Sequence, residues 1–393
     1  AERAFGDDWP QWRGPNRDGV SQETGLLMDW PGSGPSVIWR GPFGEGFSSI
    51  SIAQGRAYTM LADEHDEFAI CLEAATGTEV WRVRLDAKFT VSEGNGPRST
   101  PTIDGRRVYV LSARGRLYAL RTESGEKIWQ LNLRKLFGSG VPSWGYTASP
   151  LIEGETLIIQ GGGGSGDNCI AALDKNSGDV IWTSYADAAD YSSPIAVTAR
   201  GLRQVISLTE HTLVSLSPID GTVYWTYPFK GSINIATPLM VSEDRIFISA
   251  AYNKGAALVE MKGQKGSLEV EEIWSSRAMK NWFNPSVVSD GYLYGFDNAI
   301  LKCIAADTGE TQWRQRGFNR GSLILADGHL IVLGEDGRMA LVEATPEGYR
   351  EKARFQALEA RCWSPPSLAD GKLFVRSEEE IVCLDLTAPN KGR

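Results

Sequence analysis

Histidine and paired cysteine are the residues that this sequence has least of. Its 393 residues include three histidines, His65, His211 and His329, and five cysteines. The histidines fall more than a repeat apart along the chain, so no Ser–His–Asp or metal-ligand arrangement can be built on them. The cysteine count is odd and the cysteines are not clustered, which excludes a disulfide framework and a zinc site.

The sequence also lacks a net positive charge and long apolar runs. The formal net charge is −9, whereas a nucleic-acid partner requires a basic face, so we expect no nucleic-acid binding. No apolar run approaches the roughly 20 residues of a membrane helix, so no transmembrane segment is expected. The sequence begins with Ala rather than Met, and we expect a removed export signal, with a trimmed sequence as the alternative.

A short corner recurs along the chain. It reads EAATGTEVW at 73–81, TESGEKIW at 122–129, KNSGDVIW at 175–182 and AADTGETQW at 305–313. A residue able to bond the turn backbone precedes a glycine, which can adopt the positive φ that other residues resist. Tryptophan follows four positions after the glycine, on the next strand. We therefore expect each indole to lie over the turn of the neighbouring repeat and hold the two repeats together.

The spacing of these corners predicts an all-β chain built of repeats. Eight apolar, β-branched runs precede the turns, and only residues 276–282 could form a short helix. The docking tryptophans follow one another at intervals of 39 to 53 residues, and residues 344–355 form a degenerate corner without tryptophan. They are Trp39, Trp81, Trp129, Trp182, Trp225, Trp274 and Trp313.

The two ends of the chain complete the last repeat. Residues 381–389 open a corner that has no tryptophan after it, and residues 36–40 contain a tryptophan with no corner before it. Four strands per repeat and a shared final repeat predict an eight-bladed β-propeller with four-stranded antiparallel blades. The N-terminal strand should close the ring. We expect a leader at 1–35 that packs on a single propeller domain at 36–393.

The corner pattern resembles the tryptophan-docking motif of the quinoprotein-dehydrogenase-like (PQQ-repeat) propellers. The resemblance covers roughly residues 36–387. This superfamily includes pyrroloquinoline-quinone (PQQ) alcohol dehydrogenases and the non-enzymatic propeller lipoprotein of the bacterial outer-membrane β-barrel assembly machine. The leader stretch DWPQWRGPNRDGVS at 8–21 is similar to the start of exported bacterial PQQ-binding-like repeat proteins. The resemblance implies a periplasmic or secreted location.

The loops that lead into the innermost strands should converge around the mouth of the central channel. Aromatic rings beside guanidinium groups suit a sugar ring, a quinone or a peptide segment, whereas packing between blades is the alternative reading. Phe47, Lys280, Asn281 and Phe283 fall in the same loops. The predicted ligand-binding residues are Arg98, Trp144, Tyr146, Tyr191, Trp282, Asn284, Arg320, Arg361 and Trp363.

Three other features carry little functional signal. The acidic loops at 62–68, 334–337 and 376–380 lack calcium-loop spacing and are expected to be solvated. The glycine run at 161–167 has strands on both sides, so it is predicted to be a flexible loop rather than a phosphate cradle. Cys362 has no activating neighbour and is expected to be a packing residue.

Three functions remain open. The first is an exported, monomeric binding or scaffold propeller that holds a protein segment or a glycan at the channel mouth. The second is a PQQ- and calcium-dependent alcohol or sugar dehydrogenase. The resemblance implies that such an enzyme holds calcium with a carboxylate and an amide, and Asp297–Asn298 is the pair to test. Many members also carry a disulfide between adjacent cysteines, which this chain lacks. The third is a carbohydrate-active hydrolase or lyase, for which the sequence places no paired carboxylates.

Overall fold

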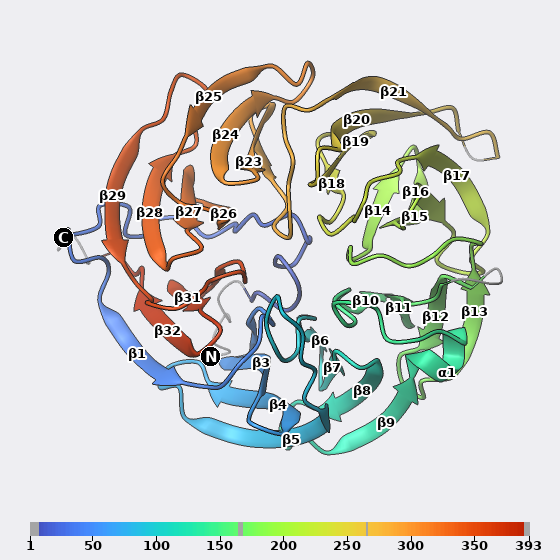
Figure 1. Ribbon diagram of the computed structural model, residues 1–393, viewed down its shortest axis with the longest axis horizontal. Helices are drawn as coiled ribbons and strands as arrows, with labels where there is room; N and C mark the ends of the chain where they lie inside the picture. Colours follow the sequence, from blue (N-terminus) through green and yellow to red (C-terminus); the bar gives the residue numbers. More distant parts are fainter. Residues whose placement is uncertain (1–7, 164–167, 265, 389–393) are drawn as a thin grey trace, which may run out of the picture.

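The computed structural model describes residues 8–163, 168–264 and 266–388. Within these residues, strands β1 to β32 form eight four-stranded antiparallel sheets arranged as a ring (Figure 1). Each blade runs from an innermost strand beside the channel to an outermost strand at the rim. The predicted eight-bladed propeller is confirmed. No described helix is long and apolar enough to span a membrane.

The first four blades follow one another in chain order. Blade 1 holds β2 (Ser51–Ala53), β3 (Arg56–Ala62), β4 (Asp66–Glu73) and β5 (Glu79–Ala87). Blade 2 holds β6 (Thr102–Asp104), β7 (Arg107–Leu111), β8 (Arg116–Arg121) and β9 (Lys127–Asn132). Blade 3 holds β10 (Leu151–Glu153), β11 (Thr156–Gln160), β12 (Ile170–Asp174) and β13 (Val180–Ser184). Blade 4 holds β14 (Ile195–Ala199), β15 (Leu202–Leu208), β16 (Thr212–Leu216) and β17 (Val223–Pro228).

The remaining blades continue the ring. Blade 5 holds β18 (Leu239–Met240), β19 (Arg245–Ala250), β20 (Gly255–Lys262) and β21 (Glu269–Ser276). Blade 6 holds β22 (Val287–Ser289), β23 (Tyr292–Asp297), β24 (Ile300–Ala305) and β25 (Thr311–Gln315). Blade 7 holds β26 (Ser322–Ala326), β27 (His329–Leu333), β28 (Arg338–Glu343) and β29 (Glu351–Gln356). Blade 8 holds β30 (Ser367–Ala369), β31 (Lys372–Arg376), β32 (Glu380–Asp385) and β1 (Val37–Pro42).

The short helix lies elsewhere than expected. Residues 277–282 form bends and coil, so the segment that could at most have formed one short helix forms none. The helix is α1 (Leu133–Phe137), directly after β9. Asn132 caps its start by accepting a hydrogen bond from Lys135 N, and Gly138 ends it at φ 63°. The five residues between these caps make little more than one turn, which is too short to leave a helical period in the sequence.

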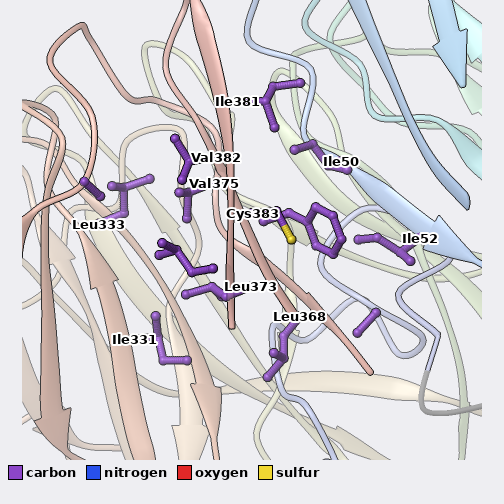
Figure 2. Close-up of a cluster of buried hydrophobic side chains, with 14 of the residues drawn as sticks. Ile50, Ile52, Ile331, Leu333, Leu368, Leu373, Val375, Ile381, Val382 and Cys383 are labelled. Carbon is purple, nitrogen blue, oxygen red and sulfur yellow. The ribbon is translucent and has the colours of Figure 1, made fainter. Parts of the chain in front are cut away.

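The ring closes as the chain ends predicted. Outermost strand β1 pairs with β32 in antiparallel register, with Trp39 opposite Cys383 and Pro42 opposite Glu380. One buried apolar cluster continues through this closure and joins blades 7, 8 and 1. Figure 2 shows part of this cluster, whose labelled members include Ile331 and Leu333 of blade 7, Leu373 and Val382 of blade 8, and Ile50 and Ile52 of blade 1.

Six of the seven predicted docking tryptophans join neighbouring blades. Each indole N–H donates to a backbone carbonyl in the corner of the next blade, at 2.7–3.2 Å. The corner glycine lies directly under the ring: a Cβ added to Gly77 would sit 2.6 Å from Trp39. The six pairs are Trp39–Ala74, Trp81–Thr122, Trp129–Lys175, Trp182–Pro218, Trp274–Ala306 and Trp313–Thr345.

Two seams are held differently. Trp225 donates to the side chain of Gln204 in its own blade, at 2.9 Å, because the corner of blade 5 lacks the hydroxyl–glycine pattern. In blade 7, Ala353 pairs with Leu341 at the register that tryptophan occupies in other blades. There the leader supplies the missing ring, because Trp30 packs edge-on against Phe355 with centroids 5.8 Å apart. The Trp30 indole donates to the Leu27 carbonyl within the leader at 2.9 Å, so it packs at this seam without forming the cross-blade bond of the docking tryptophans.

The leader also crosses the channel, as its dark blue trace in the middle of Figure 1 shows. It touches the turns around Gln54, Asp327 and Gly371, which belong to the face of the ring that carries the docking corners. Its hydrogen bonds reach all eight blades. The partners are Ile52, Ile103, Ser149, Pro150, Pro194, Thr237, Pro285, Ser286, Leu325, Gly371 and Leu386.

Two arginines anchor the leader inside the channel. Arg13 donates to the carbonyls of Pro285 and Ser286 at 2.8 and 2.6 Å. Arg17 donates to the carbonyls of Ser149, Pro150 and Pro194. Both side chains are 2% exposed. The innermost strand of each blade is a sheet edge with unpaired carbonyls, and these arginines satisfy some of them.

All five cysteines are buried and free. Burial raises the pKa of Cys362 to about 12, so its thiol stays protonated. Residues 164–167 of the glycine run lie outside the described residues.

Candidate functional site

A cavity of about 360 Å³ lies at the mouth of the channel, on the face opposite the docking corners. Loops from all eight blades and one residue of the leader form its wall, and most of the lining atoms are apolar. This size and lining are typical of a small-ligand site. The lining residues are Trp12, Phe47, Glu93, Arg98, Trp144, Thr147, Ser149, Tyr191, Ser193, Ile235, Tyr252, Trp282, Phe283, Arg320 and Trp363.

Aromatic rings form a continuous arc along one side of the cavity. Tyr252 packs edge-on against Trp282 at 5.1 Å, and Trp282 lies 6.1 Å from Phe283. Phe283 then contacts Trp363 at 4.8 Å, and Trp363 contacts Phe47 at 5.0 Å. The arc therefore crosses from blade 5 to blade 1. Its faces and edges can stack on a planar group or on apolar side chains.

A second aromatic pair stands across blades 3 and 4. Trp144 and Tyr191 lie 5.2 Å apart, and the Tyr191 hydroxyl accepts a hydrogen bond from Trp144 N at 3.4 Å. Thr147 donates to the Tyr191 carbonyl at 2.7 Å. These bonds fix the loop that carries Trp144, so the pair is held in place before any ligand arrives.

Two arginines of the cavity wall form no ion pair with a carboxylate of the described residues. Arg98 donates to the carbonyls of Gly96 and Gly94 at 2.8 and 2.6 Å, which leaves three of its five N–H groups free for a ligand. Burial lowers its pKa to about 10, so it remains charged at neutral pH. Arg320 lies 3.6 Å above the Trp282 ring. Positive charge is thus held against aromatic faces.

Carboxylates are few at this site. Glu93 is the one acid in the lining; it is exposed at the rim and accepts a hydrogen bond from Ser92 at 2.6 Å. Glu335 lies behind the wall, where it accepts the indole N–H of Trp363 at 2.8 Å. Hydrolysis of a glycosidic bond requires two carboxylates flanking one bond, and the lining does not supply such a pair.

The residues that PQQ and calcium would require do not fit. Asp297, the carboxylate singled out by the resemblance, is buried and ion-paired to both Lys280 and Lys302. Two ammonium groups already neutralise this carboxylate, so it would attract a calcium ion only weakly. Asp297 is also absent from the cavity lining. Within the described ranges, no three His, Cys, Asp or Glu side chains gather as a metal site.

Six of the nine predicted site residues line the cavity. They are Arg98, Trp144, Tyr191, Trp282, Arg320 and Trp363. Tyr146 is 3% exposed, and its hydroxyl donates to the Gly140 carbonyl at 3.3 Å, so it belongs to the core. Asn284 donates to the Gly321 and Trp363 carbonyls from a buried position. Arg361 pairs with Glu378 at 2.7 Å and stacks on Trp363.

The last three residues therefore support the wall from behind. Arg361 lies 4.3 Å from the Trp363 ring centroid and 5.2 Å from that of Phe47, so it packs against two rings of the arc. Asn284 fixes the backbone at Trp363. They shape the cavity without reaching into it.

Sequence reasoning missed two lining residues of the arc and the floor. Tyr252 lies in the loop between β19 and β20, the two middle strands of blade 5. Loops between middle strands were predicted to be acidic and solvated rather than part of the site. Trp12 belongs to the leader, and its indole N–H donates to Thr237 Oγ1 at 2.9 Å from inside the channel. A tryptophan followed by two arginines, Arg13 and Arg17, in a segment outside the repeats was the available signal for Trp12.

Acids of the three acidic loops bond protein groups, either in their own loop or in a neighbouring one. The expectation that they are solvated is wrong for Glu67, which is buried and accepts hydrogen bonds from Phe89 N and Ala113 N. Asp63 accepts hydrogen bonds from the backbone N–H groups of His65 and Asp66, both at 2.8 Å. Asp336 pairs with Arg338, and Glu378 pairs with Arg361. These bonds shape the loops themselves.

The model of a protein family described as outer membrane protein assembly factor BamB matches residues 31–166 and 65–315 of this chain. These matches span more than half of its length, so the chain belongs to this family. A curated relative, the outer membrane protein assembly factor BamB of Yersinia pestis, is 22% identical over 372 residues. That match covers 88% of this chain and 88% of the relative.

Solved structures agree in fold. The crystal structure of BamB from Moraxella catarrhalis matches 89% of this chain and 99% of its own, with a TM-score of 0.65 at 14% identity. The quinohemoprotein alcohol dehydrogenase ADHIIG of Pseudomonas putida HK5 matches 98% of this chain and 81% of its own, with a TM-score of 0.67 at 13% identity. At such identities the likeness shows the fold alone. The resemblance carried by the corner motif is confirmed.

Proposed function

We propose that this BamB-family propeller is a non-catalytic binding protein that works outside the cytoplasm. It holds a segment of a partner protein in the cavity at the mouth of its channel. The observation that carries this proposal is the arc of five aromatic rings, from Tyr252 to Phe47, beside two arginines that form no ion pair with a carboxylate of the described residues. Aromatic and arginine side chains are those most enriched at the energetic centres of protein interfaces.

The dimensions of the cavity set how much of a partner can enter. A volume of about 360 Å³ holds a few side chains, not a folded surface. The walls are fixed before binding by contacts such as Trp363 to Glu335 and Tyr191 to Trp144. A rigid aromatic cavity loses little conformational entropy when it takes up a flexible segment, so the binding free energy is retained.

The family and the chemistry support binding over catalysis. The family is described as an outer membrane protein assembly factor, and that description and the leader support an exported location. A quinone-dependent dehydrogenase is the second candidate, favoured only by the fold shared with quinohemoprotein alcohol dehydrogenase. The ion pairs that neutralise Asp297 argue against it. A shared fold does not carry function.

Arrays separate these functions. Labelled protein is applied to a peptide array and a glycan array, alongside the variants Trp282→Ala in the cavity and Ile219→Ala. Ile219 is 81% exposed and lies in the docking corner of blade 4, away from the cavity, so it is the control. We expect peptide spots that the wild type and Ile219→Ala bind and that Trp282→Ala loses.

Two results would overturn the proposal. Binding confined to glycans would assign the cavity to carbohydrate recognition. Retention of PQQ with calcium after desalting, seen as a bound chromophore, together with oxidation of an alcohol, would establish the dehydrogenase.

A further inference from the structure

We infer that the cavity binds the free C-terminal end of its partner chain, with apolar side chains on the aromatic arc and the terminal carboxylate on Arg98 or Arg320. This inference rests on the proposed function and names the chemistry of the segment. Three features of the cavity carry it: a closed floor, arginines with unused N–H groups, and aromatic rings beside those arginines.

The floor comes first, because a propeller channel open at both ends would let a chain pass through. Here the leader lies in the channel beneath the cavity. Its hydrogen bonds reach all eight blades, from Ile52 at the docking-corner end to Ser149 of the cavity lining, and Trp12 lines the cavity from below. Its indole is anchored to Thr237 at 2.9 Å, and its neighbour Arg13 is buried and bonded to the Pro285 carbonyl. The cavity is therefore a dead end, which suits a chain terminus better than the middle of a chain.

The charge comes second. A chain end carries a carboxylate that internal residues lack, and burying it requires donors that are not already paired. Arg98 donates two of its five N–H groups to the Gly94 and Gly96 carbonyls, which leaves three for a ligand. Arg320 donates no side-chain hydrogen bond to the residues that the structure describes, and its guanidinium is stacked on Trp282. The single acid of the lining, Glu93, is exposed at the rim and bonded to Ser92.

The aromatic rings come third. Arg98 lies 5.5 Å from the centroid of Phe47, and Arg320 lies 3.6 Å from that of Trp282, so each guanidinium adjoins one end of the arc. A carboxylate bound to either arginine would bring the last side chains of the partner onto Phe47, Phe283 or Trp282. Apolar or aromatic final residues fit this surface, whereas charged ones would be desolvated against the rings.

Matched peptides test the inference. One heptapeptide ending in phenylalanine, labelled at its N-terminus, is prepared as the free acid, as the C-terminal amide, and as the free acid extended by two glycines. Fluorescence anisotropy then gives the dissociation constants. We expect the free acid to bind about tenfold or more tightly than the amide, because charge-assisted hydrogen bonds to the carboxylate are lost. The extended peptide should also bind more weakly, because phenylalanine no longer reaches the arc.

Variants locate the effect. Arg320→Gln should reduce the preference for acid over amide. The Arg320 side chain donates no hydrogen bond to the described residues, so we expect the fold to be retained. Arg98→Gln is the second variant. Arg114→Gln is the matched control, since Arg114 also donates to two backbone carbonyls, of Ala87 and Lys88, but does not line the cavity.

The outcomes are distinguishable. Equal binding of acid and amide, both lost in Trp282→Ala, would overturn the chain-end inference and leave the proposed function standing. Displacement by free 3-phenylpropionate at the same concentration as the peptide would assign the site to small aromatic acids instead. Failure of every peptide to bind, here and on the peptide array, would overturn the proposed function itself.

Discussion

The two ends of the channel contain the same kinds of residue in opposite states. At the end that the leader occupies, beneath the cavity, Arg13 and Arg17 are buried, and their guanidinium groups bond backbone carbonyls from several blades. At the mouth, Arg98 and Arg320 are half-buried, stand beside aromatic rings, and keep N–H groups unused. Tryptophan accompanies arginine at both ends. Residue type therefore does not separate a structural arginine from one available to a ligand.

The difference lies in how accessible each group is. A buried guanidinium that donates to fixed carbonyls is closed off from any ligand, even where one N–H such as Arg13 Nε lacks a partner, and removing it leaves those carbonyls unpaired. A guanidinium at the mouth is partly hydrated, so a ligand exchanges its water for a carboxylate without breaking the fold. Substitutions at the two ends should accordingly separate loss of stability from loss of binding.

Arg17→Ala should have the largest effect, a loss of about 5 kcal/mol in the free energy of unfolding. The change opens a cavity and leaves the Ser149, Pro150 and Pro194 carbonyls without a donor. Urea denaturation measures it. Arg114→Ala is the control, because Arg114 bonds two carbonyls from a half-exposed loop and should lose at most about 1 kcal/mol. Equal losses in the two variants would contradict the contrast between the ends.

Trp182→Ala should follow, with a loss of about 3 to 4 kcal/mol, since its indole covers Gly221 and bonds the Pro218 carbonyl across the seam. A double-mutant cycle with Gly221→Ala isolates the contact. A Cβ at Gly221 would sit 2.7 Å from Trp182, so Gly221→Ala should cost less once the tryptophan is gone. Additive losses would show that the ring does not dock on the glycine.

The docking end was more predictable from sequence than the mouth, for a physical reason. The corner is local: the hydroxyl residue, the glycine and the tryptophan lie within a few residues of one another. The turn bond, the positive φ and the docking ring that the corner needs each follow from one of these residue types. Ring closure was predicted because the two half-repeats at Trp39 and Cys383 complement one another. The anchoring of Arg17 could not be predicted. The leader lies outside the repeats, so the repeat pattern does not indicate which carbonyls its side chains reach.

The mouth was predictable only as a set of loops. Loop order along the chain indicates which loops converge, and six of the nine predicted residues line the cavity. It does not indicate the direction of each side chain. Tyr146 turns into the core and Arg361 stands behind Trp363, because their loops fold back through bonds to Gly140 and Glu378.

Asp190→Asn sharpens the comparison through pH. Burial raises the pKa of Asp190 to about 7, and its Oδ2 accepts Asn234 N at 2.5 Å, a bond that asparagine can keep. Because the folded pKa lies above the unfolded one, the wild type loses stability as pH rises from about 4 to about 7, and the loss levels off above pH 7. The variant lacks this loss. It should match the wild type near pH 4 and be more stable by about 2 kcal/mol at pH 8. Urea midpoints across this range that never diverge would contradict the expectation.

Trp282→Ala should have the smallest effect on folding, about 1 kcal/mol or less, because the ring is half-buried at the cavity edge and contacts the exposed Tyr252. Its effect on the mouth is larger, since Arg320 loses the ring on which it is stacked and the arc loses the ring that joins Tyr252 to Phe283. Thermal unfolding and peptide binding are measured on the same preparation. A small shift in Tm with binding abolished places this tryptophan among the groups left free for a ligand. A loss of stability comparable to that of Trp182→Ala would place it among the structural ones, and the contrast between the two ends would fail.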